Sequence, residues 1–410
     1  MSDPYFQTLF ADRIGGSQYG QGTDIYKFEK IKRAKRAAIA ASPDRPLLDF
    51  GIGENDEMAP GSVRSAMKTE IDRLENRGYA DNGIAEYKEA AAAFLEREFG
   101  VTVDPVTEVN HCIGSKTALA MLPAAFINPG DITLMTVPGY PVAGTHTQYY
   151  GGQVFAMPLL EKNGFRPDLQ AVPDEIYQRT KLMVLNYPNS PTGALADESF
   201  YRDVIALAEA KKFVVIQDAA HSMLSYGRKP LSFLEVEGAK EVGVEVHSMS
   251  KGFDMIGWRL GFVAGNERIV RAFADVKDNN DSGQFIAIQK AAAAALGDAS
   301  IPTSIRSKYE RRLRKLVGIL NAIGFEAKMP GGTYFLYVRA PRGVEGGATF
   351  ATGEDASQFL IRERSICTVP WDDAGSYLRF SVTYYAPTEA DEDALMQQLR
   401  ARLADDRFVW

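Results

Sequence analysis

Between about residue 107 and residue 295, short apolar strand-like runs alternate with helix-like stretches. The runs are VNHCIG, ITLMTV, KLMVLNY, KFVVIQD, VGVEVHS and LGFVAG, and most are rich in β-branched residues. Strands that are apolar throughout are typical of a parallel or mixed sheet that is covered on both faces. The alternation therefore predicts an α/β fold with a mostly parallel, mixed sheet between helices.

The two ends of the chain follow a different pattern. Residues 1–55 hold a glycine cluster, a basic helix-like run over residues 27–41 and a short strand-like run, LLDFGIG. Residues 300–410 begin with a charged helix-like stretch and continue with strand-like TYFLYV and LRFSV and a final helix-like segment. We interpret 1–55 and 300–410 as one small α+β domain, and 56–299 as a large domain inserted between them. The basic run is interpreted as the solvated face of a helix.

The composition restricts the class of protein. A chain of 410 residues with 45% hydrophobic content is long enough for one large and one small domain. The net charge of −7, with both signs interspersed, argues against a nucleic-acid partner. Two distant cysteines, Cys112 and Cys367, suit a reducing compartment. No secretory signal and no membrane-length apolar run is visible, so we expect a soluble, cytoplasmic protein without a membrane partner.

Polar residues follow the apolar runs, and the carboxyl ends of parallel strands meet at one edge of a sheet. Gly114, Ser115 and Lys116 turn the chain from a strand into a helix, where N–H groups attract an anion and the two side chains add donors. Such a turn is also common without any ligand. Tyr140 follows ITLMTV and can lay its ring on a flat aromatic cofactor, although a tyrosine between prolines usually packs in a turn.

Two further strand ends carry polar groups. Asn189 in NYPNSPTG can donate a hydrogen bond to a phenolate oxygen. Asp218 ends FVVIQD, where a buried carboxylate is costly unless a cation pairs with it. A protonated pyridine nitrogen is such a cation, and the ring then withdraws electrons. His221 can bond to the 3'-oxygen of that ring, the alternative being a structural histidine.

The segment SMSKGFDMIGWRLG places Lys251 behind a serine-rich turn and Arg259 eight residues further on. A lysine here can form a Schiff base with an aldehyde and later move a proton at the substrate Cα. Ser248, Ser250 and Arg259 would complete an anion site, Arg259 through a two-pronged contact. Alone, Lys251 would be an ordinary surface lysine. Together with the other motifs it predicts a site for pyridoxal 5'-phosphate (PLP).

Arg379 lies in YLRFSVTYY, a strand-like run of the small domain. If it faces the cleft, its guanidinium would bind a substrate α-carboxylate through two hydrogen bonds. The alternative is a structural salt bridge. No metal site is predicted.

With these motifs in this order, the chain resembles the fold-type I, PLP-dependent aminotransferases over nearly its whole length. Within them it is most similar to the LL-diaminopimelate aminotransferases, through segments such as LLDFGIGENDEMAP, NRGYADNGIAEYKEAA and KPLSFLEVEGAKEVGVEVHSMSK. The resemblance implies transfer of an amino group between LL-2,6-diaminoheptanedioate and 2-oxoglutarate, giving tetrahydrodipicolinate and glutamate, on the route to lysine. It also implies a homodimer with active sites at the subunit interface.

The resemblance implies roles for individual residues. The catalytic residues would be Lys251, which forms the Schiff base, Asp218, which holds the ring nitrogen, and Tyr140. Tyr79 would reach the phosphate in the partner subunit. The remaining cofactor contacts would be Ser115, Lys116, Asn189, His221, Ser248, Ser250 and Arg259. The substrate contacts would be Tyr26, Gly53, Lys116, Tyr140, Asn189 and Arg379.

Three positions depart from the family pattern. His221 stands where a tyrosine is usual, and some carbon–sulfur lyases of the same fold have a histidine there. Ser190 replaces the second of two asparagines, and Ser282 falls where relatives have a substrate-contacting asparagine. The alternatives are an aminotransferase with another amino donor (lysine, or an aromatic or branched residue) and a β-eliminating lyase. A third alternative is a catalytically idle module, against which the intact lysine and its neighbours argue.

Overall fold

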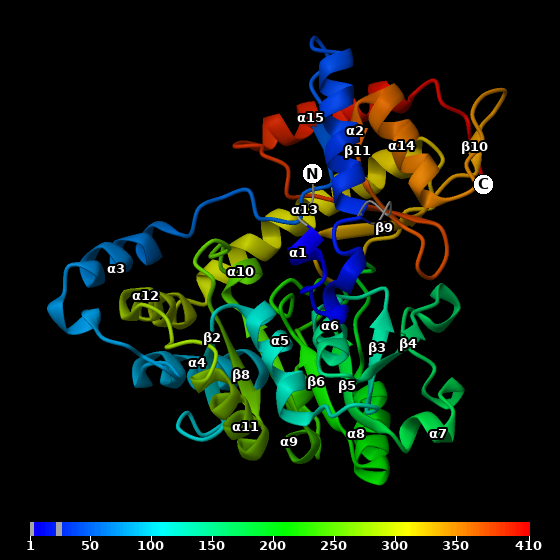
Figure 1. Cartoon of the computed structure of the whole chain (residues 1–410). Helices are drawn as coiled ribbons and strands as arrows, with labels where there is room; N and C mark the ends of the chain where they lie inside the picture. Colours follow the sequence, from blue (N-terminus) through cyan, green and yellow to red (C-terminus); the bar gives the residue numbers. More distant parts are fainter. Residues whose placement is uncertain (1–3, 22–26) are drawn as a thin grey trace.

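The computed structural model describes residues 4–21 and 27–410 (Figure 1). At its centre lies a seven-stranded sheet in the order β2-β8-β7-β6-β5-β3-β4. Neighbouring strands are parallel except at β8, which runs antiparallel to both β2 and β7. The predicted α/β fold with a mostly parallel, mixed sheet is therefore confirmed. The strands are β2 (Val109–Cys112), β3 (Ile132–Val137), β4 (Gln153–Pro158), β5 (Thr180–Asn186), β6 (Val214–Asp218), β7 (Gly243–Ser248) and β8 (Gly261–Gly265).

Both faces of this sheet are covered by helices. Successive residues of β5 alternate between two apolar clusters: Leu182 and Val184 belong to one, Met183 and Leu185 to the other. Because neighbouring side chains of a strand point to opposite faces, each cluster fills one face. The helices of this region are α4 (Ala85–Phe99), α5 (Ser115–Phe126), α6 (Val142–Tyr149), α7 (Asp174–Tyr177), α8 (Glu198–Lys211), α9 (Ala239–Val242), α11 (Glu267–Asp278) and α12 (Ile286–Gly297). Helix α12 packs against α4, and α3 (Gly61–Ile71) packs against α12, away from the sheet (Figure 1).

Strand β4 was not predicted from the sequence. It lies at the edge of the sheet and pairs only with β3, and most of its side chains are at least partly exposed. An edge strand does not need the continuous apolar run by which the other six strands were recognised.

Segments from both ends of the chain meet above the carboxyl edge of the sheet (Figure 1). Strand β1 (Leu48–Asp49) pairs with β11 (Ile366–Cys367), and α2 (Lys27–Ala41) packs against α14 (Gly353–Arg364). These contacts support the predicted small α+β domain, whose boundaries stay a prediction. The other elements there are α13 (Ser300–Ala322), β9 (Phe335–Arg339), β10 (Gly343–Val344), β12 (Val369–Trp371), β13 (Tyr377–Ser381), α15 (Glu389–Leu403) and β14 (Phe408–Val409).

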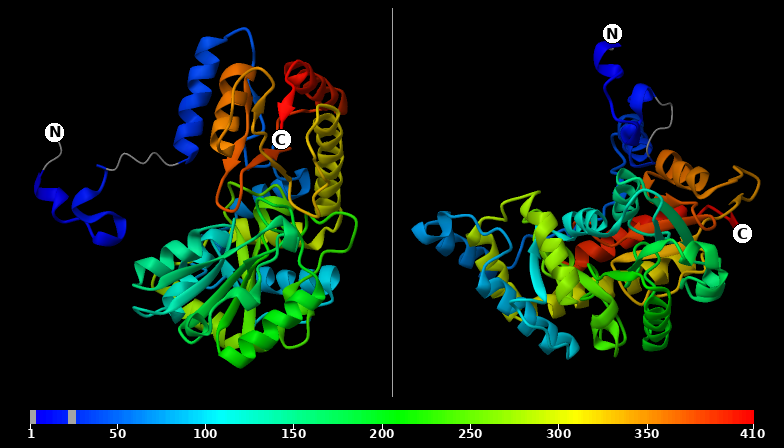
Figure 2. Two further views of the ribbon diagram at one scale, coloured as in Figure 1. Left: turned by 90° about the vertical axis from the view of Figure 1, so that its right-hand side faces the viewer. Right: turned by 60° about the horizontal axis from the view of Figure 1, so that its bottom comes forward.

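The basic run of α2 presents one apolar stripe to the protein. Ile31, Ala34 and Ala38 are buried in a cluster with Ile361 of α14, while most of the basic residues face outward. In Figure 2 the short α1 (Pro4–Gln7) stands away from the sheet and from the segments above it. Among the described residues, no helix combines the length and the apolar character that crossing a bilayer requires.

Candidate active site

A cavity of about 900 Å³ lies where the carboxyl ends of β3, β5, β6 and β7 face the small antiparallel sheet β12-β13-β9. Most of the predicted site residues line this one cavity, although they come from segments far apart in the sequence. They are Gly53, Ser115, Lys116, Tyr140, Asp218, His221, Ser248, Ser250, Lys251, Arg259 and Arg379.

Asp218 brings a buried carboxylate into the cavity from the end of β6. Its Oδ1 accepts a hydrogen bond of 3.1 Å from the N–H of Ala220. Burial raises the pKa of Asp218 to about 6, although that N–H and the charges of His247 and Lys251 oppose the rise. Within residues 4–21 and 27–410, no cation forms an ion pair with this carboxylate. A cationic ligand that paired with this carboxylate would therefore offset the cost of its burial.

His221 lies three residues beyond Asp218 and is also buried. Burial, together with the charges of Lys251 and Arg379, lowers the pKa of its imidazole to about 3, so the ring is neutral near pH 7. Its Nδ1 is buried without a hydrogen-bond partner among the described residues. The edges of Tyr334 and Phe335 pack around the ring, at centroid distances of 5.4 and 5.9 Å.

Lys251 lies in the short helix α10 (Met249–Gly252), directly after β7. Its Nζ donates a hydrogen bond of 3.0 Å to the carbonyl of Gly53 and lies 5.6 Å from the centre of the Tyr334 ring. The same carbonyl accepts a bond of 2.8 Å from the Tyr334 hydroxyl. The amine is thus held at the cavity by groups that carry no negative charge.

The predicted anion site is assembled from two turns. The first turn of α5 begins at Ser115, where the helix N–H groups and dipole favour an anion. From the second turn, Arg259 donates to the hydroxyl of Ser250 at 3.2 Å and to the carbonyl of Ile256 at 3.0 Å. Gly114 joins the two: its φ is +75°, and a Cβ there would lie 2.4 Å from Nη2 of Arg259. Only glycine lets the guanidinium come so close.

Arg379 on β13 places a buried guanidinium on the side of the cavity that the small antiparallel sheet forms, across from the strand ends of the large sheet. Nη2 donates to the Gly51 carbonyl at 3.1 Å, and the group lies 4.1 Å from the centre of the Phe335 ring. Its Nε is buried without an acceptor, and no carboxylate in the described part of the chain pairs with it. Burial lowers the pKa of Arg379 to about 10, which leaves it charged at neutral pH.

The structure contradicts the prediction that Asn189 donates into the site. Asn189 is fully buried, its Nδ2 faces the Pro138 carbonyl at 3.4 Å, and its Oδ1 accepts from the N–H and hydroxyl of Thr192. The side chain therefore holds the turn together. Ser190, the next residue, lines the cavity instead.

Two predicted contacts lie elsewhere. Tyr79 does not line the cavity of its own chain, and 86% of it is exposed. Tyr26 lies outside the described residues. Sequence reasoning also missed several lining residues: Asn186, Tyr334, Phe335 and Trp371. Asn186 stands in the same NYPNSPTG motif, but Tyr334 and Phe335 were seen only as part of a strand-like run.

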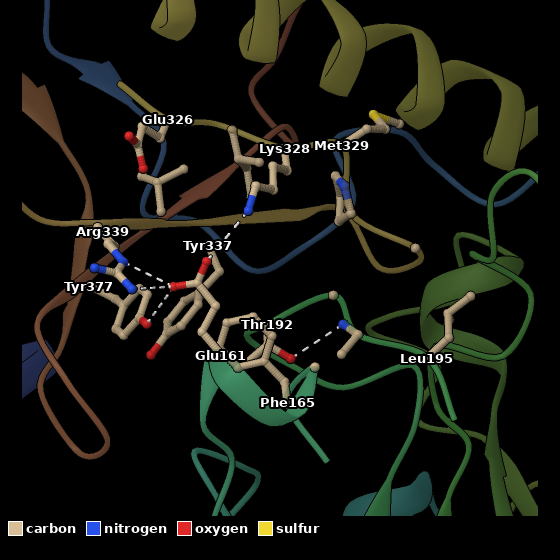
Figure 3. Close-up of a pocket in the computed structure, with 17 residues that line it drawn as sticks. Glu161, Phe165, Thr192, Leu195, Glu326, Lys328, Met329, Tyr337, Arg339 and Tyr377 are labelled. Carbon is tan, nitrogen blue, oxygen red and sulfur yellow. Dashed lines mark hydrogen bonds and ion pairs between the residues drawn. The ribbon is translucent and has the colours of Figure 1, made fainter. Parts of the chain in front are cut away.

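A second, smaller cavity of about 250 Å³ lies between the turn at Thr192 and strand β9 (Figure 3). Glu161, from the segment after β4, forms ion pairs with Arg339 at 2.8 Å and with Lys328 at 3.6 Å. Its carboxylate also accepts from the hydroxyl of Tyr377 at 3.3 Å. This cluster ties the edge of the large sheet to the small antiparallel sheet.

Comparisons with known proteins agree with this architecture. The family model described as aminotransferase class I and II matches residues 45–399. An LL-diaminopimelate aminotransferase of Methanocaldococcus jannaschii is 55% identical, with 98% of each chain covered. One of Methanococcus maripaludis is 54% identical over the full length of both chains.

Solved structures share the fold over almost the whole chain. Substrate-bound BacF from Bacillus subtilis has a TM-score of 0.86 at 30% identity, with 98% of each chain covered. A mutant aspartate aminotransferase of Thermus thermophilus has a TM-score of 0.83 at 25% identity and covers 96% of this chain and 99% of its own. The chain therefore belongs to the aminotransferase class I and II family, as an enzyme of the transaminase class, and within it to the LL-diaminopimelate aminotransferases.

Proposed function

We propose that the protein uses PLP to transfer an amino group from LL-2,6-diaminoheptanedioate to 2-oxoglutarate, giving tetrahydrodipicolinate and glutamate. The observation that carries the proposal is the pair of buried charges, Asp218 and Arg379, that line one cavity with Lys251 and have no ion-pair partner within the described chain. The identity of 55% to a relative named for this reaction supports the choice of substrate.

The residues present fit PLP. Asp218 would hold the protonated ring nitrogen, which supplies the cation that its carboxylate lacks. His221 and Ser190 both line the cavity and would bond to the ring's oxygen. Ser115, Ser248, Ser250 and Arg259 would hold the phosphate, and Tyr140 would flank the ring. When bound, PLP supplies an aldehyde for the amine and a ring that withdraws electrons.

The protein's own groups then have distinct tasks. Arg379 would bind the α-carboxylate of the substrate, because a buried guanidinium without a carboxylate partner gains most from a bidentate contact. Lys251 would take the proton from the α-carbon of the amino donor and pass it to the bound cofactor, and would deliver a proton to the α-carbon of the oxo acid in the second half of the reaction. Its Nζ donates to a neutral carbonyl, that of Gly53, so no carboxylate has to release it. Lys116 is exposed at the cavity and would contact the substrate from its outer side.

The same proposal includes a homodimer. Tyr79 is 86% exposed and does not serve its own cavity, which suits a residue that reaches the phosphate of a partner subunit. Tyr5, Phe6 and Leu9 near the amino terminus are each more than half exposed and would be covered by a second copy. Both cysteines are free and buried, which suits the cytoplasm.

An absorbance spectrum tests the proposal. We expect purified protein with PLP to show a visible band that gives way to a near-ultraviolet band when LL-2,6-diaminoheptanedioate is added. If the band persists with this compound but is lost with lysine or an aromatic amino acid, that amino acid would be the amino donor in place of LL-2,6-diaminoheptanedioate. Lys251→Ala should abolish the response, whereas Lys240→Ala, which removes an ion pair with Glu108 outside the cavity, should not.

A second candidate, β-elimination, is favoured by the neutral histidine at position 221. Release of pyruvate and ammonia from cystathionine measures it directly. The proposal expects this rate to be negligible beside transamination; a lyase rate that exceeds the transaminase rate would overturn it.

A further inference from the structure

The segment that follows β1 contacts Lys251 at both ends of that residue. The carbonyl of Gly53 accepts from Nζ at 3.0 Å, and the side chain of Asn55 donates to the main-chain carbonyl of Lys251 at 2.8 Å. One short segment therefore contacts both ends of the lysine: Gly53 contacts its amine, and Asn55 contacts its backbone. A shift of this segment would move the acceptor that holds Nζ.

Asn55 is itself tied to the turn that follows Lys251. Its Nδ2 makes a short hydrogen bond to Oδ1 of Asp254, a residue that is buried and has a φ of +53°. This left-handed conformation is unusual for a residue other than glycine, although asparagine and aspartate tolerate it best. One amide thus closes a small ring through Lys251 and Asp254, which we call the Asn55–Asp254 clasp.

The charges around the clasp leave Asp254 without a strong cationic partner. Lys308 of α13 forms ion pairs with Asp56 and Glu57, each at 3.1 Å, and Asp56 also pairs with Arg312 at 3.0 Å. Burial and the neighbouring Asp56 and Glu57 raise the pKa of Asp254 to about 6, against the opposing bond from Asn55 and the charge of Lys308. The hydroxyl of Tyr309 lies near Asp254 as well, and it donates a hydrogen bond of 3.2 Å to Asp56.

We propose that Asn55 and Asp254 are positioning residues, which hold the Gly53 carbonyl against Nζ of Lys251 and so set the resting place of the reactive amine. The inference rests on the proposed role of Lys251. Neither residue lines the cavity, so neither would touch cofactor or substrate. Their effect would be passed on through the Gly53 carbonyl and the Lys251 backbone.

The reactivity of Lys251 in the cofactor-free protein tests this directly. Reductive methylation of that lysine, followed by peptide mass spectrometry, reports how firmly Nζ is held without any substrate or turnover. Asn55→Ala should speed labelling of Lys251 about fivefold, the factor that a single hydrogen bond is worth. The matched control is Asn321→Ala, which removes an amide that likewise bridges a loop, to Ala327, but far from the lysine in the fold. It should leave the labelling rate unchanged.

A second variant, Asp254→Asn, keeps the shape of the clasp and removes its charge. Above pH about 6 the ionised Asp254 accepts more strongly than an amide oxygen would, so the variant should label about threefold faster than wild type at pH 8. Below pH about 5 Asp254 is protonated, and the two proteins should label equally. In the loaded enzyme, Asn55→Ala should lower kcat more than it changes KM.

The outcomes separate this inference from the proposed function. Equal labelling of Lys251 in wild type, Asn55→Ala and Asp254→Asn at both pH values would overturn the clasp, whatever substrate the enzyme uses. If Asn55→Ala does not fold, as a melting curve would show, the pH difference between wild type and Asp254→Asn still decides the matter. A loss of that difference would contradict the inference.

Discussion

At the scale of single residues, the site is distinguished by buried charged groups that the described chain leaves without an ion pair. Asp218 and Arg379 are 4% and 6% exposed, respectively. Other buried charges have partners outside the cavity: Lys277 pairs with Asp281 and Arg312 with Glu392, while Asp254 is held by the side chain of Asn55. Because an uncompensated buried charge destabilises a fold, its presence in a cavity indicates a bound ligand of opposite charge.

The first prediction concerns Asp218 in the protein without cofactor. Its folded pKa of about 6 is above its unfolded value, so the folded state keeps the proton longer, and stability falls as pH rises from about 4 to about 6. A shift of about two pH units corresponds to ~2–3 kcal/mol. Asp218→Asn should therefore stabilise the apoprotein by up to that amount at pH 8, and not at pH 3.5, while weakening PLP binding. Urea unfolding measures this, with the exposed Asp203→Asn on α8 as control. Equal stabilities at pH 8 would contradict it.

The second prediction concerns Arg379. Lysine keeps the charge but cannot make two parallel hydrogen bonds to a carboxylate, so Arg379→Lys should lower kcat/KM for the amino donor about tenfold to a hundredfold. Arg339→Lys is the control, because Arg339 lies on the neighbouring strand β9 and is exposed outside the cavity. Steady-state kinetics distinguish the two. A change of less than about twofold in Arg379→Lys would contradict carboxylate binding.

At the scale of elements, strand ends were predictable and side-chain directions within turns were not. Asp218 and Ser248 end apolar strands, and Lys251 follows one, so the rule that parallel strands meet at one edge was enough to group them. In the turn after β5, by contrast, only the local hydrogen bonds decide that Ser190 rather than Asn189 faces the cavity. Sequence pattern does not carry that information.

Residues brought in from the far end of the chain were also beyond prediction. Tyr334 and Phe335 form the wall around His221, yet in sequence they are separated from it by more than a hundred residues. Their run was correctly seen as strand-like, and β9 begins at Phe335. Which end of the strand reaches the cavity depends on how the small sheet sits on the large one, and no periodicity encodes that.

The third prediction belongs to the turn between β2 and α5. Gly114 and Gly100 both have a φ of +75°, but a Cβ would lie 2.4 Å from Arg259 at the first and meet nothing within 4 Å at the second. Alanine at Gly100, whose ψ of 19° is left-handed helical, should cost about 1–2 kcal/mol of stability. Alanine at Gly114 should cost at least as much, because a ψ of 155° at positive φ belongs to a region essentially restricted to glycine. Only Gly114→Ala should also displace the guanidinium of Arg259 and weaken PLP binding, by at least about tenfold. Titration with PLP checks this; equal affinities in both variants would contradict the predicted anion site.

At the scale of the whole molecule, two ion clusters join segments that are distant in sequence. The Glu161 cluster is open to solvent, with Arg339 64% and Lys328 84% exposed. The Arg312 cluster is closed: this guanidinium on α13 is 1% exposed and bonds to Glu392 of α15 and to the carbonyls of Val382, Tyr384 and Ala386. It also pairs with Asp56, beside the clasp. The closed cluster therefore connects the small domain to the segment that touches Lys251.

The fourth prediction compares these clusters. Arg312→Met should destabilise the protein by up to about 3–5 kcal/mol, because Glu392 and Asp56 lose their buried cation. Arg311 and Lys315 still pair with Glu392, and Lys308 with Asp56, which makes this figure an upper limit. Arg339→Met should cost less than about 1 kcal/mol, since water screens its ion pair with Glu161. Burial alone would raise the pKa of Glu392, but hydrogen bonds from the neighbouring cations outweigh it and lower this pKa to about 2. The stability that its charge contributes is present above pH about 4.5 and lost as pH falls towards 2. Denaturant midpoints of the two variants from pH 7 down to pH 3 should therefore converge on acidification. A gap that does not narrow would show that Arg312 contributes through packing rather than through charge.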